Sequence, residues 1–146
     1  MITTPERQSQ LLSALYIAQE EHGWLSPEAI RRVSDRLGMS PGKVLSSASF
    51  YSMMKLQPCG IYLIQVCEGL SCYLVGGADS LIDYLSQKLE IKPGETSADG
   101  LYTLEVVQCL AACGSAPALR VNDELYENIT REDIDQLIIR MQSGEL

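Results

Sequence analysis

Apolar residues recur every three or four positions through the first part of the chain, and this spacing predicts helices. Residues 6–21 place leucines and an alanine at helical spacing. Ser26 and Ser40 each stand directly before a proline. That arrangement is typical of a helix start, because serine caps the helix and proline suits its first position. The last of these helices is expected to run to about Met54, so the sequence predicts a bundle of three short helices that ends near Pro58.

The pattern changes beyond Pro58, where short apolar runs replace the helical spacing. Residues 61–66 and 101–107 are apolar and partly β-branched, which predicts strands. Residues 78–89 lie between them and predict a helix with one apolar face. Asn122-Asp123 predicts the turn of a hairpin over residues 118–126. A capping box that begins at Thr130 predicts the last helix.

This order of elements predicts an α/β fold in two parts. A strand, a helix and a second strand in succession normally form a parallel crossover. The hairpin adds antiparallel strands, and the last helix covers one face of the sheet. We therefore expect a helical bundle over residues 1–58 and a second domain, of thioredoxin-like α/β layout, over residues 59–146.

Composition excludes some classes of function. The 146 residues carry a net charge of −8, with a pI of about 4.6. Binding to a phosphate backbone needs a basic face, and none is visible, so we expect no nucleic-acid partner. The acidic balance instead fits a protein that docks on other proteins. The sequence also lacks the Gly-rich loops that bind nucleotide phosphates.

The sequence predicts neither membrane insertion nor secretion. No apolar run approaches the roughly 20 residues that a membrane-spanning helix requires. The N-terminus lacks a basic segment followed by an apolar core, which a secretory signal would show. We expect the protein to stay in a reducing compartment. Clustered cysteines there are more often metal ligands or redox groups than structural disulfides.

Four of the five cysteines form two tight pairs. Cys67 and Cys72 are spaced C-x4-C, and Cys109 and Cys113 are spaced C-x3-C. Each pair follows a predicted strand, so two neighbouring strand ends can bring four sulfurs together. Four thiolates are the ligand set of a [2Fe–2S] cluster. Glycines in or beside the loops should remove Cβ obstruction and tolerate the positive φ that wrapping needs; they are Gly69, Gly76, Gly77 and Gly114.

Other interpretations of the cysteines remain open at this point. Structural zinc also takes four cysteines, although its knuckles favour shorter and more symmetric pairs. A thiol–disulfide enzyme of this fold would show C-x-x-C after the first strand, which this chain lacks. Unliganded thiols would not need two glycine-flanked pairs. Cys59 stands before the first strand, apart from both pairs, and is expected to be an ordinary small residue.

The chain resembles the small thioredoxin-like [2Fe–2S] subunit of NADH–quinone oxidoreductase, which is respiratory complex I. The resemblance runs from about Leu11 to Met141 and is most specific in four segments: Ala48–Tyr51, Val66–Cys72, Gly94–Thr96 with Asp99-Gly100, and Cys109–Pro117. It implies an N-terminal helical bundle, a thioredoxin-like ferredoxin domain, and cluster ligands at Cys67, Cys72, Cys109 and Cys113. Two positions depart from the family: Ala111 stands where a glycine is usual, and Gly69 where a threonine is frequent.

The resemblance implies a role beside a flavoprotein. The partner subunit would hold FMN and bind NADH, and this chain's cluster would exchange single electrons with the flavin. We expect no catalytic residue and no complete active site on this chain. We therefore expect the protein in the cytoplasm, at the periphery of the inner membrane within a larger complex that includes other iron–sulfur subunits.

The same module occurs in NAD-linked formate dehydrogenases and in NAD-reducing or bifurcating hydrogenases. A free ferredoxin or a zinc-stabilised scaffold is an alternative from another class. The helical bundle favours a role within a complex, because an independent electron carrier would not need it.

Overall fold

The computed structural model describes residues 8–146, and the chain divides into two compact units between Cys59 and Gly60. Each unit is described by itself. The helix predicted over residues 6–21 begins outside the described residues. The assignment of residues 1–58 and 59–146 to separate domains stays a prediction.

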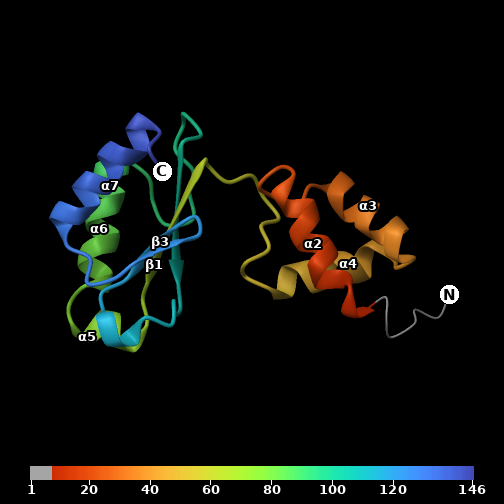
Figure 1. The fold of residues 1–146 in the computed structure, drawn as a ribbon, viewed down its shortest axis with the longest axis horizontal. Coiled ribbons are helices and arrows are strands. Elements are labelled where there is room, and N and C mark those ends of the chain that lie inside the picture. The colour runs from red at the N-terminus through yellow and green to blue at the C-terminus, as the bar shows by residue number, and fades with distance from the viewer. Residues whose placement is uncertain (1–7) are drawn as a thin grey trace. The chain divides into compact units, whose positions relative to one another are not determined.

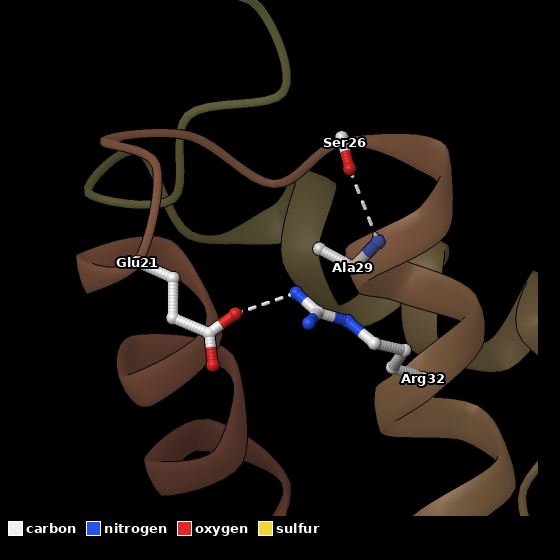
Figure 2. Close-up of polar contacts among 4 residues, drawn as sticks. All are labelled: Glu21, Ser26, Ala29 and Arg32. Atoms are coloured by element: carbon white, nitrogen blue, oxygen red, sulfur yellow. Dashed lines mark hydrogen bonds and ion pairs between the residues drawn. The ribbon is translucent and has the colours of Figure 1, made fainter.

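The N-terminal unit is helical, and serine caps begin two of its helices. It contains α2 (Leu11–Glu20), α3 (Pro27–Leu37) and α4 (Pro41–Phe50). The Ser26 side chain accepts a hydrogen bond from the amide of Ala29 at 3.1 Å (Figure 2). Ser40 caps α4 in the same way. An ion pair of 2.6 Å between Arg32 and Glu21 links α3 to the residue that follows α2.

The three helices of this unit enclose one apolar core, so the predicted bundle is confirmed. The buried side chains come from all three helices and the segments between and after them: Leu11, Leu15, Ala18, Leu25, Ala29, Ile30, Val33, Leu37, Met39, Val44, Ala48 and Met54. One boundary was predicted wrongly. Helix α4 ends at Phe50 rather than near Met54, because Tyr51 adopts an extended backbone, with φ −98° and ψ 114°.

The C-terminal unit contains a four-stranded sheet in the order β2-β1-β3-β4. Its elements, in chain order, are β1 (Tyr62–Cys67), α5 (Leu70–Leu74), α6 (Ala78–Leu89), β2 (Tyr102–Val107), the 3₁₀ turn η1 (Cys113–Ser115), β3 (Leu119–Val121), β4 (Glu124–Tyr126) and α7 (Arg131–Ser143). Strand β1 is parallel to β2 and antiparallel to β3, which pairs in turn with β4. The predicted crossover and hairpin are confirmed.

The two long helices of this unit lie together on one face of the sheet (Figure 1). They bury an apolar core against alternate residues of β1, including Tyr62, Ile64 and Val66. The predicted capping box is present at the start of α7, where Thr130 and Asp133 exchange hydrogen bonds. Helix α5 was not predicted, because five residues are too few to show a helical period. No helix within residues 8–146 is both long and apolar enough to cross a bilayer.

Candidate metal centre

The parallel pairing of β1 and β2 brings the two cysteine loops to one edge of the sheet. Cys67 is the last residue of β1 and lies in register with Val107, the last residue of β2. Two backbone bonds fix this edge: the Cys67 amide donates to the Ala118 carbonyl at 3.1 Å, and the Glu68 amide donates to the Val107 carbonyl at 2.9 Å. Cys109 follows Val107 by two residues, so both loops begin side by side.

The first pair of thiols is buried. Cys67 and Cys72 are 3% and 2% exposed and pack with three small residues, Ala78, Ala112 and Ala118. Cys72 reaches this position because it lies on α5, whose first turn begins soon after the strand. The unpredicted helix is therefore the element that presents the second thiol of the C-x4-C pair.

The second pair of thiols lies at the surface. Cys109 and Cys113 are both exposed, and their sulfurs are 3.9 Å apart. Two sulfurs bonded at about 2.3 Å to one tetrahedral ion lie roughly 3.8 Å apart. The observed separation therefore suits two thiolates that share one metal ion.

All four thiols lie close enough to influence one another. Cys67 shares hydrogen bonds with Cys72 and Cys109, and Cys113 interacts with Cys109 and Cys67. None of the five cysteines forms a disulfide. Within residues 8–146, no three His, Cys, Asp or Glu side chains form a group that could hold a single metal ion. A [2Fe–2S] cluster requires only two thiolates at each iron.

Backbone amides surround the sulfurs. The amides of Gly69 and Leu110 hydrogen-bond to Cys67, and the amide of Ala118 hydrogen-bonds to Cys72. The Ala111 amide donates to the sulfur of Cys109 at 3.3 Å. Such donors stabilise negative charge on sulfur, and they help to set the potential of iron–sulfur centres. The donor set therefore fits an anionic cluster held by four thiolates.

These contacts move the pKa values of the thiols in different directions. Burial acts to raise the pKa of Cys67, but the amides of Gly69 and Leu110 and the neighbouring thiols outweigh burial and leave this pKa lowered. Burial dominates at Cys72 and raises its pKa, with a further contribution from Cys67. The pKa of Cys113 is raised, first by its hydrogen bond with Cys109 and then by charge repulsion from the same residue. The pKa of Cys67 is thus lowered, whereas those of Cys72 and Cys113 are raised.

Two glycines let the loops approach each other closely. A Cβ at Gly77 would lie 2.4 Å from Cβ of Pro117, and a Cβ at Gly69 would lie 2.9 Å from the Gln108 carbonyl oxygen. Gly76 has a positive φ of 70°, as expected for a wrapping loop. The expectation was wrong for Gly114, whose φ is not positive and whose Cβ would meet no atom within 4 Å.

Ala111 occupies a backbone conformation that favours glycine. Its φ is 61°, in the left-handed region, where a Cβ is disfavoured by about 1–2 kcal/mol. The same residue donates its amide to Cys109. Ala111 therefore holds an unfavourable backbone angle beside a candidate ligand.

Cys59 belongs to the N-terminal unit as its last residue. Its thiol contacts the Gln57 carbonyl oxygen at 3.7 Å. One hydrogen bond between the two loops was not predicted from the sequence. The side chain of Gln108 donates to the carboxylate of Glu68 at this edge of the sheet. A polar residue directly before Cys109 was the available signal.

A family profile matches this chain over residues 1–142, and its description is thioredoxin-like [2Fe-2S] ferredoxin. The chain belongs to this family. Members of the thioredoxin-like [2Fe–2S] ferredoxin family carry a [2Fe–2S] cluster, so the group that the thiols are expected to hold is the family's own cofactor.

Curated relatives from three bacteria are similar over nearly the whole chain, and each is named as a subunit of NADH-quinone oxidoreductase. The relative from Thermus thermophilus is 41% identical over 95% of this chain and 77% of its own length. The relative from Mycobacterium bovis is 38% identical over 95% of this chain, which spans only 55% of that relative. The relative from Rhizobium meliloti is 36% identical over 97% of this chain and 83% of its own length.

The fold is also similar to part of a solved hydrogenase. A chain in the crystal structure of an NAD+-reducing [NiFe]-hydrogenase, in the H2-reduced state, superposes with a TM-score of 0.81 at 26% identity. The match covers 92% of this chain and 22% of the hydrogenase chain. This thioredoxin-like ferredoxin module therefore occurs within longer chains as well.

Proposed function

We propose that this chain is the electron-transfer subunit of an NADH-oxidising complex, in which Cys67, Cys72, Cys109 and Cys113 hold a [2Fe–2S] cluster. The cluster exchanges single electrons with FMN on a partner flavoprotein that binds NADH. NADH–quinone oxidoreductase is the proposed host, because the relatives at 36–41% identity carry that name. We place the chain in the cytoplasm, beside the inner membrane within that complex.

One observation carries the ligand assignment. Two thiol pairs from distant parts of the chain converge at one edge of the sheet, and backbone amides point at their sulfurs. When bound, a [2Fe–2S] cluster takes up and releases one electron at a time. Cys67 and Cys72 would hold the cluster from the buried side, and Cys109 and Cys113, whose sulfurs are 3.9 Å apart, would hold it from the exposed side.

A second host has one specific observation in its favour. The TM-score of 0.81 with a chain of an NAD+-reducing hydrogenase supports a hydrogenase as the alternative host of this chain. Its identity of 26% is well below the 36–41% of the NADH-quinone oxidoreductase subunits, which favours the first host. In both hosts the chain would serve the same role beside a nicotinamide-linked partner.

The metal content of the purified chain tests the site. We expect a brown protein with about two irons and two sulfides per chain and an S = 1/2 EPR signal only after reduction. One zinc ion per chain, in protein made under cluster-assembling conditions, would overturn the assignment.

Rapid mixing with NADH tests the function. Because the partner is proposed to supply the flavin, the isolated chain should not be reduced, whereas its cluster in the pair with the flavoprotein should be reduced only when FMN is bound. Visible and EPR spectra follow the reduction. NADH reduction of the isolated, flavin-free chain would contradict an accessory electron-transfer role.

A further inference from the structure

The segment that carries Cys72 exposes large apolar side chains to solvent. Leu70, Tyr73, Leu74 and Val75 are 74%, 59%, 71% and 59% exposed. The first three lie at i, i+3 and i+4 of α5 and so share one side of the helix. Cys72 is buried on α5. A helix that is apolar on both its inner and its outer side is one that becomes buried in a larger assembly.

Charged residues are also rare in both cysteine loops, where Glu68 is the single one between the first and last cysteine of either pair. Asp, Glu, Lys and Arg are absent from residues 69–78 and 106–119, although they make up 21% of the chain. The net charge of −8 therefore lies entirely outside these two segments. Loss of charged residues, with gain of aromatic and large apolar ones, distinguishes the core of a protein interface from the rest of a surface.

The two uncharged segments adjoin each other at the thiols. Helix α5 packs against η1, which begins at Cys113, and both lie at the end of the sheet where β1 finishes (Figure 1). The exposed thiols of Cys109 and Cys113 thus belong to the same end of the unit as the apolar side of α5. A redox partner must cover the surface next to the redox centre, because electrons pass between centres only over short distances.

We propose that the α5 face, formed by Leu70, Tyr73, Leu74 and Val75, is the docking surface for the flavoprotein partner and meets an apolar, uncharged face of that flavoprotein. This inference rests on the proposed function and names the surface that serves it. An uncharged face complements an uncharged partner and forms a lasting complex, whereas a ferredoxin that exchanges partners relies on charge to steer its encounters. The docking is therefore held by burial of apolar area and depends little on salt.

Substitution at the centre of this face tests the inference in the complex. Leu74→Glu should weaken association of the cluster-loaded chain with the FMN-loaded flavoprotein by about 30-fold or more, as expected for a central interface position. Ile139→Glu is the matched control, since Ile139 is 56% exposed on α7, and it should change the dissociation constant by less than about 2-fold. Equal binding by Leu74→Glu with an unchanged cluster spectrum would overturn the inference.

Footprinting of the unmodified chain keeps the test independent of that variant's folding. Hydroxyl-radical labelling of Tyr73 and Leu74 should fall several-fold when the flavoprotein is added, while labelling of Ile139 stays constant. Raising the salt from about 50 mM to about 500 mM should change the dissociation constant by less than about 3-fold. Labelling of Tyr73 and Leu74 that stays unchanged when the flavoprotein is added would overturn the inference. Labelling that falls in the isolated chain as its concentration rises would also overturn it, and would identify a second copy of this chain as the occupant.

Combining footprinting with NADH mixing separates the two proposals. Reduction of the cluster in the pair without protection of Tyr73 and Leu74 would leave the proposed function standing and remove this docking surface. Protection of both residues without reduction of the cluster by NADH would remove the proposed function and leave the docking surface standing.

Discussion

The two cysteine pairs differ in burial more than in spacing. Cys67 and Cys72 pack among small residues inside the unit, whereas Cys109 and Cys113 lie at its surface. The inner pair therefore contributes to packing as well as to the proposed ligation, and the outer pair contributes to ligation alone. The fold should depend on the inner thiols with or without metal, and on the outer thiols only when metal is bound.

The largest expected effect is the same for both pairs and concerns the loaded protein. Serine in place of Cys67, Cys72, Cys109 or Cys113 should abolish or severely weaken cluster binding, because a cluster that ties two loops together also stabilises the fold. Iron content and the visible spectrum measure the loss. Cys59→Ser is the control and should keep the spectrum; a bleached Cys59→Ser beside a brown Cys72→Ser would show that the ligands are assigned wrongly.

In the metal-free protein, substitutions in the two cysteine pairs should differ in their effect on stability. Cys72→Ser should lower the free energy of unfolding of the apoprotein by about 1–3 kcal/mol, because it replaces a buried thiol with a more polar hydroxyl group among small apolar side chains. Cys113 lies at the surface, so Cys113→Ser should change the free energy of unfolding by less than about 0.5 kcal/mol. Urea unfolding of both apoproteins gives the comparison, and equal losses would mean that the two pairs do not differ in packing.

Contact between the loops can be broken without touching a ligand. Gly77→Ala should cost about 1–3 kcal/mol, since its Cβ would lie 2.4 Å from Pro117 and the backbone must shift. Gly114→Ala is the matched control in the other loop, where a Cβ meets no neighbour within 4 Å. Thermal melts of both variants measure the difference. Similar melting temperatures would show that close approach of the loops is not required.

The smallest expected effect concerns the backbone of the outer loop. Ala111→Gly should stabilise the protein by at most about 1 kcal/mol, because it relieves a left-handed φ but adds freedom to the unfolded chain. It should also shift the midpoint potential, since the residue 111 amide donates to Cys109. A redox titration beside a melt measures both. Equal midpoints would show that this amide does not tune the cluster.

Local signals in the sequence predicted the long elements well. Serine caps marked the starts of α3 and α4, and short, partly β-branched apolar runs with a helix between them marked β1, α6 and β2. The same crossover brought the four predicted ligands to one edge of the sheet. The sequence could be interpreted this far because each signal depends on neighbours along the chain.

The remaining features depend on contacts between distant residues. Helix α5 is too short to show a helical period, and in the sequence its exposed apolar residues cannot be distinguished from buried core residues. The burial of Cys72 and the exposure of Cys113 follow from packing of one loop on the other, which two similar cysteine spacings do not reveal. The φ of Ala111 is likewise set by the loop and not by alanine, which by itself avoids that region.

The parallel pairing of β1 with β2 also governs when in the life of the protein its site can exist. The first thiol pair is synthesised before α6 and β2, so a nascent chain that ends before Cys109 offers only half of the proposed ligands. Pairing between strands so far apart along the chain must first overcome the entropy of closing the intervening segment. Because the four proposed ligands come together only when β1 pairs with β2, a molecule that holds a cluster on all four would be one whose crossover has already closed.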